Sequence, residues 1–336
     1  MKGIPALLKF NEEEFTAQLA SAAALRPGIE ALAAQLGDGV KNVYFLGAGG
    51  SYAEMMPYAL LLQTKSTLPG VAAVAQEFML VPDTAFGEGS VAVFVSATGS
   101  TPDVNKAIDW AKAKGAVTVG FTGDADSPFA QALDHVFLSS AHSYDIQLLL
   151  LVTGLLQRRG EFADYERFAD QLALLPSLLV DVAKQADSKA SVFANKHRDV
   201  EYLFVVGSGN VWGYAYLYSM CVLEECQWLH TTRVHAAEFF HGSLELIEKD
   251  TTTLLFYGED ETRPLMDRVR SFVDLYCDDV TVFDTADYPL EGIDPSFRAL
   301  LSPLVIGTAA SRLSTHLELV RNHRLDVRRY YRVVEY

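Results

Sequence analysis

The chain has 336 residues, of which 50% are hydrophobic and 21% are charged, and its formal net charge at pH 7 is −16. This length allows two domains with a core each. The acidic excess disfavours nucleic acid and anionic membrane surfaces as partners, because both are negatively charged. No apolar run is long enough for a signal peptide or a bilayer span, and the three cysteines show no CxxC spacing. We therefore expect a cytoplasmic protein with reduced thiols.

The first half is predicted to alternate short apolar strands with helices. Apolar residues recur at spacings of three and four over residues 10–36, which indicates a helix interrupted at Pro27. Later helices are expected to begin near Tyr52 and Pro102, each directly after a strand and its loop. Such repeated units favour a parallel sheet with helices on both faces. The expected strands cover residues 43–46, 71–75, 91–95, 117–121 and 134–137.

Two helical connectors, residues 143–158 and 162–189, separate this half from a second half with the same pattern. Gly207 and Gly209 follow Gly47 and Gly49 by 160 residues (207 − 47 and 209 − 49), in matching junctions after a strand. We therefore predict a duplicated α/β fold of two tandem, doubly wound, parallel-sheet (flavodoxin-like) domains. The predicted domains are residues 1–165 and 166–336, and the second-half strands are expected at 202–206, 253–257 and 280–283.

Two turns of the first half are rich in glycine and small hydroxyl residues, GAGGS after the first strand and SATGST after the third. Ligands gather at the carboxyl ends of parallel strands, and a helix start there favours an anion. Either turn taken alone could equally be a phosphate site or an ordinary helix cap. Two such turns in the same half favour a phosphate site. Neither is a P-loop or a GxGxxG motif, so no dinucleotide is expected. The predicted phosphate residues are Gly49, Ser51, Ser96, Thr98, Ser100 and Thr101.

The corresponding turns of the second half are GSGNV and GEDET. The acidic residues Glu259, Asp260 and Glu261 in the second turn would repel a phosphate. One phosphate site per chain, in the first half, is therefore expected.

Residues 224–242, EECQWLHTTRVHAAEFFHG, gather three histidines and three carboxylates. Such groups can move protons at C1 and C2 of a sugar phosphate and open its ring. Glu225 ends an apolar helix, and Gly242 allows a sharp turn that presents His241. For each residue alone, the ordinary alternative is a solvated carboxylate or a hydrogen-bonded histidine. No HExxH motif and no histidine pair four residues apart occurs, so no metal site is predicted.

These motifs together resemble the SIS (sugar isomerase) family over nearly the whole chain. They are the two tandem halves, GAGGSY, SATGST, and a Glu sixteen residues before the His of EFFHG (241 − 225). The segment MCVLEECQWLHTTRVHAAEFFHGSLELIE and the tail RRYYRVVEY are most similar to fructosamine-6-phosphate deglycases, which act on fructoselysine and fructose-asparagine derivatives. Both predicted domains are then SIS-type domains.

The resemblance implies a role for each part. The two turns hold the phosphate, Glu225 moves a proton between C1 and C2, and His241 assists ring opening and later acid–base steps. It also implies a homodimer or larger oligomer with a site shared between subunits, a tail near Arg328 closing over a site, and no cofactor. Possible contacts to the substrate amine or carboxylate are His230, His235 and Glu238.

The implied reaction cleaves a fructosamine 6-phosphate to an aldose 6-phosphate and a free amino acid. Val222 stands where glucosamine-6-phosphate synthase has a functional lysine, which argues against that synthesis. Two alternatives stay open at this point. One is an aldose–ketose phosphosugar isomerase, and the other is a sugar-phosphate sensor without catalysis.

Overall fold

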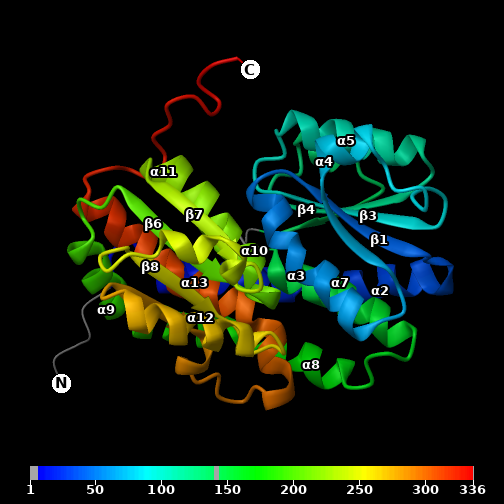
Figure 1. Ribbon diagram of the computed structural model, residues 1–336. Coiled ribbons are helices and arrows are strands. Elements are labelled where there is room, and N and C mark those ends of the chain that lie inside the picture. Colours follow the sequence, from blue (N-terminus) through cyan, green and yellow to red (C-terminus); the bar gives the residue numbers. More distant parts are fainter. Residues whose placement is uncertain (1–6, 140–143, 336) are drawn as a thin grey trace. The chain divides into compact units, whose positions relative to one another are not determined.

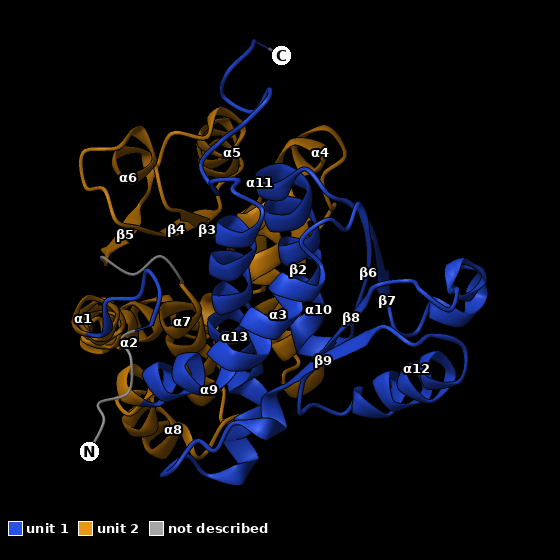
Figure 2. Cartoon of the chain, turned by 90° about the vertical axis from the view of Figure 1, so that its left-hand side faces the viewer, with its two compact units in different colours: residues 1–12, 178–336 blue, residues 13–177 orange. Residues whose placement is uncertain are grey.

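The structure is a computed structural model that describes residues 7–139 and 144–335 (Figure 1). It divides into two compact units (Figure 2). The N-terminal unit is Glu13–Ser177, and the C-terminal unit combines Leu178–Tyr336 with the residues up to Glu12. In the part of the chain that the structure describes, no helix has the length and hydropathy needed to cross a membrane.

The N-terminal unit is built on five parallel strands in the order β2-β1-β3-β4-β5. This is the flavodoxin-like order that was predicted. The central strands β1 and β3 are buried along their whole length, because helices cover both faces and the strand sequences are apolar runs. The strands are β1 (Asn42–Gly47), β2 (Gly70–Val74), β3 (Ser90–Ser96), β4 (Val117–Thr122) and β5 (His135–Leu138).

Helices of this unit begin and end close to the predicted positions. The predicted helix over residues 10–36 is two helices, and Pro27 lies in the first turn of the second, where its missing N–H costs nothing. A short helix directly after β2 was not predicted. The helices are α1 (Glu12–Ala23), α2 (Arg26–Leu36), α3 (Gly50–Lys65), α4 (Ala75–Leu80), α5 (Pro102–Ala113), α6 (Pro128–Ala132), α7 (Asp145–Arg158) and α8 (Tyr165–Leu172), with a 3₁₀ turn at Gly37–Gly39.

The C-terminal unit repeats the topology with four parallel strands in the order β7-β6-β8-β9. The strands are β6 (Tyr202–Gly207), β7 (His230–His235), β8 (Thr253–Tyr257) and β9 (Val280–Asp284). The helices are α9 (Leu175–Lys196), α10 (Trp212–Leu217), a π-helix at Tyr218–Glu224, α11 (Glu225–Gln227), α12 (Arg263–Tyr276) and α13 (Arg298–Val320). The 3₁₀ turns are Gly209–Val211, Phe239–His241, Ser243–Leu246, Thr285–Asp287 and Pro295–Phe297. Strand β7 and helix α13 were not predicted.

The repeat seen in the sequence corresponds to equivalent positions in the two sheets. Strands β1 and β6 end at Gly47 and Gly207, and Gly49 and Gly209 have nearly the same positive φ, 55° and 54°. Only glycine adopts this conformation readily. The two halves therefore share the turn after their first strand as well as their strand order, which confirms the duplicated fold.

The turn after β6 is filled by a carboxylate of the chain itself. Asp260 accepts hydrogen bonds from the backbone N–H of Asn210 (2.7 Å) and of Thr262 (2.8 Å), and from the Thr262 hydroxyl (2.5 Å). A Cβ at Gly209 would lie 2.3 Å from Asp260 Oδ2. Asp260 therefore occupies the place where an anion would approach this turn, which supports the expectation of a single phosphate site in the first half.

Removing this internal anion is expected to destabilise the C-terminal unit. In Asp260→Ala, the N–H groups of Asn210 and Thr262 lose their acceptor, which we expect to lower the free energy of unfolding by about 2 kcal/mol. Urea unfolding measures the change. Asp267→Ala, at an exposed position of α12, is the matched control and should stay within about 0.5 kcal/mol of the parent. Equal losses in the two variants would contradict the assignment.

Candidate phosphate turns and acid–base pocket

The two predicted phosphate turns lie at one edge of the N-terminal sheet. Strands β1 and β3 are parallel neighbours, so the turns that follow Gly47 and Ser96 leave the sheet at the same edge. The strand order reverses direction between β1 and β3, and ligands of open α/β sheets bind at this reversal point. Each turn also leads into a helix, α3 or α5. The edge thus has the geometry of an anion site.

The GAGGS turn is tight. A Cβ at Gly47 would lie 2.6 Å from the backbone nitrogen of Tyr52, so a larger residue would displace the start of α3. Gly49 precedes this helix with its positive φ. The Ser51 hydroxyl accepts the N–H of Ala48 (3.1 Å) and donates to its carbonyl (2.9 Å). These bonds hold Ser51 at the first turn of α3.

The SATGST turn presents its hydroxyl groups differently. Ser96 is buried, and its oxygen accepts the N–H of Gly99 (3.0 Å), which shapes the turn. Thr98 and Ser100 are exposed, and their hydroxyl oxygens lie 2.8 Å apart. Helix α5 begins at Pro102, as predicted, and Thr101 is its N-cap residue. The hydroxyl groups of Thr98 and Ser100 thus lie together at the surface of this turn.

Glu225 lies at the end of a distorted helix in the C-terminal unit. The chain from Trp212 begins as an α-helix, continues as a π-helix over Tyr218–Glu224, and returns to α-helical geometry at Glu225. π-helical turns are rare and occur often at functional sites. Trp228 then ends the helix with a positive φ of 55°, which is uncommon for a bulky residue.

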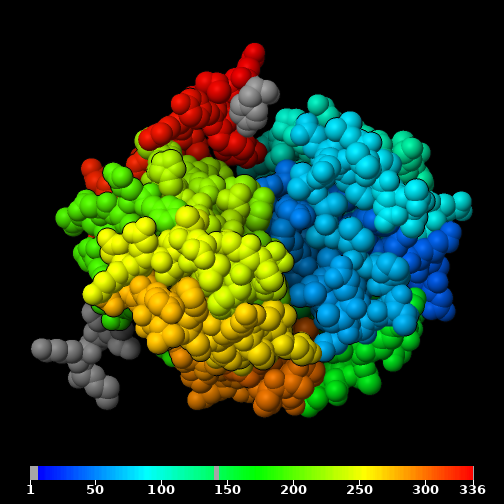
Figure 3. Space-filling view, in the orientation of Figure 1, coloured from blue at the N-terminus to red at the C-terminus, as the bar shows by residue number. Residues whose placement is uncertain are grey.

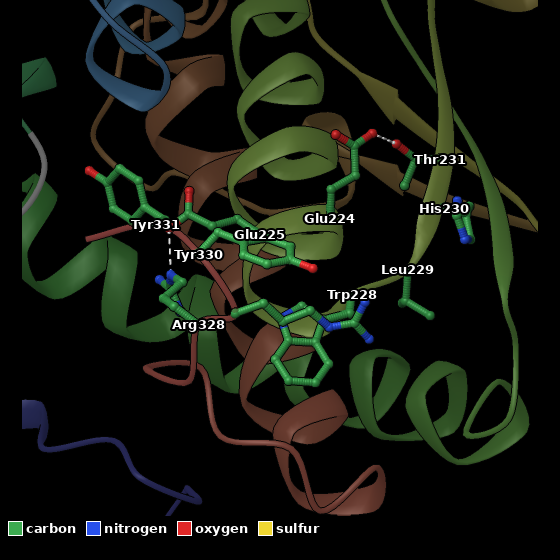
Figure 4. A pocket seen from close by; sticks show the side chains of 10 residues that line it. Glu224, Glu225, Trp228, Leu229, His230, Thr231, Arg328, Tyr330 and Tyr331 are labelled. Atoms are coloured by element: carbon green, nitrogen blue, oxygen red, sulfur yellow. Dashed lines mark hydrogen bonds and ion pairs between the residues drawn. The ribbon is translucent and has the colours of Figure 1, made fainter. Parts of the chain in front are cut away.

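The end of this helix lines a cavity of about 580 Å³ (Figure 4). One side comes from the helix end and the start of β7, and the other comes from the segment after α13. In Figure 3, this C-terminal segment lies over the surface around α11. The lining residues are Glu224, Glu225, Trp228, Leu229, His230, Thr231, Arg328, Arg329, Tyr330 and Tyr331.

The two adjacent carboxylates have separate partners. Glu224 turns to β7, where Oε1 accepts a hydrogen bond from Arg233 Nη1 (2.9 Å) and one from the Thr231 hydroxyl. Glu225 turns to the C-terminal segment, where Oε1 accepts a hydrogen bond from Arg328 Nε (2.8 Å; Figure 4). Among the described residues, no hydrogen bond is made to the other oxygen of Glu225. One oxygen of Glu225 is thus bonded to Arg328, and the other accepts no hydrogen bond within the described residues.

The remaining candidates of the acid–base stretch are spread over β7 and the turn after it. His230 is exposed and lines the cavity, whereas His235 is half-buried at the end of β7. Burial lowers the pKa of His235. Glu238 and His241 are exposed beside the turn Phe239–His241 and do not line the cavity. The cavity thus brings Glu225 and His230 together, but not His235, Glu238 or His241.

Gly242 follows His241 with a φ of 147°, which favours glycine and agrees with the sharp turn that was predicted. No group of three His, Cys, Asp or Glu side chains within residues 7–139 and 144–335 is arranged to hold a metal ion.

Arg233 and Arg329 were not predicted as site residues, and Arg328 was expected only as part of the tail. Arg329 lies over the Trp228 ring, with its guanidinium carbon 4.1 Å from the ring centre. The only sequence signal for Arg328 and Arg329 was the run RRYYR, whose partners lie about a hundred residues earlier in the chain.

Residues 39–152, which contain both phosphate turns, match the family model of the SIS domain. The chain is 34% identical to the fructosamine deglycase FrlB of Bacillus subtilis over 310 residues, which are 89% of this chain and 94% of that protein. The chain belongs to the SIS family. The likeness to a deglycase extends over both units, because the matched region is longer than either.

Other relatives agree with this assignment. The fructoselysine 6-phosphate deglycase of Escherichia coli K12 is 27% identical, with 88% of this chain and 87% of that protein covered. A crystal structure of a proposed phosphosugar isomerase from Bacillus subtilis superposes with a TM-score of 0.88 at 32% identity, over 94% of this chain and 99% of that one. The two-unit SIS fold is thus shared along the whole length.

The pKa of Glu54, which lies in α3 shortly after Ser51, gives a pH-dependent prediction. Burial, with the nearby charge of Asp145, raises this pKa to about 8, so the fold favours the protonated form. Its contribution is favourable below the unfolded pKa of 4.5 and is lost as the pH rises towards 8. Glu54→Gln should remove this dependence, so its stability relative to the parent should increase from pH 4.5 to 8.

Urea unfolding of both proteins across this range measures the effect. Glu77→Gln, at an exposed carboxylate of α4, is the control and should follow the parent at every pH. Parallel curves for the parent and Glu54→Gln would show that Glu54 does not titrate in this way.

Proposed function

We propose that this protein is a deglycase that cleaves a fructosamine 6-phosphate to an aldose 6-phosphate and a free amino acid. The observation that carries the proposal is the likeness to FrlB over 94% of that protein, in a chain whose Glu225 carboxylate faces a cavity with one oxygen open. The fructoselysine 6-phosphate deglycase among the relatives supports the same substrate class.

In the proposed mechanism, His241 assists opening of the sugar ring by moving a proton between a hydroxyl and the ring oxygen. Glu225 then takes a proton from C1, the C–H electron pair forms the C1=C2 bond, and the C2=O π pair moves to the oxygen, which takes a proton from solvent to give an enaminol. Protonation at C2 moves the double bond to C1=N, with the nitrogen lone pair, and gives a protonated imine. Water adds to C1 and a proton passes from the added water to nitrogen. The C–N bond then breaks with its electron pair on nitrogen, the C1 hydroxyl loses its proton to form the C1=O of the aldose, and the amine leaves.

Arg328 has a positioning role in this scheme. Its hydrogen bond to Oε1 fixes the rotamer of Glu225 and directs the second oxygen of the carboxylate into the cavity. Val222, one turn before Glu225, carries no amine, which supports hydrolysis of an existing C–N bond over amination of a sugar.

The phosphate group of the substrate is assigned to the GAGGS and SATGST turns, with Gly49, Ser51, Ser96, Thr98, Ser100 and Thr101. The assignment rests on the position of the two turns, which follow the neighbouring strands β1 and β3, where the strand order reverses. Each turn carries hydroxyl groups and leads into a helix. We also propose a homodimer in which His241 acts on the partner's substrate, since His241 does not line the cavity of Glu225.

The first test of the proposal is amine release. The purified protein is incubated with the 6-phosphates of fructose-lysine and fructose-asparagine, and free amino acid and glucose 6-phosphate are followed together. We expect the two products in equal amounts. Conversion of simple phosphosugars without amine release would favour the isomerase suggested by the Bacillus subtilis structure. Binding without conversion of either class would favour a sensor.

Single substitutions test the acid–base residues. Glu225→Gln and His241→Ala should each lower kcat by about a hundredfold or more, because each removes a proton-transfer group. Glu224→Gln is the matched comparison, since this neighbouring carboxylate is engaged by Arg233 and Thr231. A larger loss in Glu224→Gln than in Glu225→Gln would move the base to Glu224.

A third measurement addresses the phosphate turns. Ser100→Ala removes an exposed hydroxyl from the SATGST turn and should raise KM for the phosphorylated substrate about tenfold, with kcat nearly unchanged. The unphosphorylated fructosamine serves as the control, and its weak turnover should be unaffected by the substitution. Equal effects on the two substrates would place the phosphate elsewhere.

A further inference from the structure

The side chains around the cavity beside Glu225 include one arginine that no carboxylate of the cavity neutralises. Glu224 is paired with Arg233, and Glu225 is paired with Arg328. Arg329 also lines the cavity, and no hydrogen bond or ion pair joins it to a carboxylate within the described residues.

The guanidinium of Arg329 is held in place without an acid. It stacks on Trp228 at 4.1 Å, and the same ring contacts the edge of His323, with the ring centres 4.2 Å apart. Burial, with the charges of Arg321 and Arg329, lowers the pKa of His323, so this histidine adds no competing positive charge at neutral pH. Stacking on a Trp face leaves the N–H groups at the guanidinium edge available for hydrogen bonds.

A planar guanidinium with open N–H groups is suited to a carboxylate, which it can bind through two parallel hydrogen bonds. The amino acid released by the proposed reaction carries such a carboxylate. Tyr330 and Tyr331, which follow Arg329 in the chain and also line the cavity, give the rest of the amino acid an aromatic surface.

We propose that Arg329, supported by Trp228, binds the carboxylate of the amino acid on the substrate and thereby selects amines that carry a carboxylate. This inference rests on the proposed deglycase function. It assigns a specificity-determining residue that lies outside the acid–base stretch and adds a subsite distinct from the two phosphate turns.

The test compares substrates with and without the carboxylate. Two pairs of fructosamine 6-phosphates are used. The first pair carries lysine, linked through Nε, or cadaverine, and the second carries glycine or methylamine. In each pair only the first compound has a carboxylate. The parent is expected to prefer the carboxylate-bearing member of at least one pair by about tenfold or more in kcat/KM. The pair that shows the preference indicates how far the carboxylate lies from the reacting nitrogen.

Arg329→Gln should abolish this preference, so that the two members of each pair are converted with equal kcat/KM. Arg329→Lys keeps the charge but not the planar fork and should give an intermediate preference. Arg324→Gln is the matched control, because Arg324 is exposed, pairs with Asp326 and does not line the cavity. No preference in the parent, or a preference that survives in Arg329→Gln, would overturn the assignment.

Calorimetric binding of the same four compounds separates this inference from the proposed reaction. If the parent releases no amine from any of them, the deglycase proposal fails. Carboxylate-dependent binding that disappears in Arg329→Gln would still support the subsite, and binding without any dependence on the carboxylate would reject it.

Discussion

The hydrogen bond between Glu225 and Arg328 joins two segments that are 103 residues apart, and the cavity exists because they are joined. A partly exposed ion pair contributes at most about 1 kcal/mol. The stacking of Arg329 on Trp228 and the bond from Arg328 Nη1 to the Leu325 carbonyl (2.6 Å) add to it. Within the described residues, the C-terminal segment after α13 is thus held by a few polar and stacking contacts and buries no side chain fully.

The two halves have equivalent turns at the edge of the sheet where their first strands end, but these turns carry different chemical groups. In both sheets, the first strand ends in a glycine-rich turn at the point where the strand order reverses. In the N-terminal unit this turn and its neighbour carry hydroxyl groups, whereas in the C-terminal unit Asp260 fills the turn. The acid–base residues of the C-terminal unit lie on the next helix and on β7. Duplication followed by divergence therefore gives the two halves different groups at equivalent turns of one scaffold.

The sequence was sufficient to predict the fold because the central strands are apolar runs that lead directly into glycine-containing or hydroxyl-rich turns. Strand β1 and strand β8 were placed within one residue of their ends for this reason. Strand β7 was missed because HTTRVH is polar; it is an edge strand, which pairs with β6 on one side only and is buried at Val234 alone. Helix α13 was not predicted.

The candidate site was predicted less completely, for physical reasons. Motifs identified Glu225 and the hydroxyl turns, since each lies within a short stretch of sequence. The π-helical turn before Glu225 depends on packing in the fold, and no residue pattern marks it. The bonds of Arg233 to Glu224 and of Arg328 to Glu225 require strand pairing and a distant tail, so local sequence could not predict them.

Asp260 can be viewed as a ligand that is covalently part of the receptor. Its carboxylate is present at a fixed ratio of one per turn, so occupancy of this turn does not depend on the cellular phosphate concentration. The Asp260 carboxylate therefore makes a constant contribution to the stability of the C-terminal unit, whereas a ligand at the hydroxyl turns would add to the stability of the N-terminal unit only when that ligand is present.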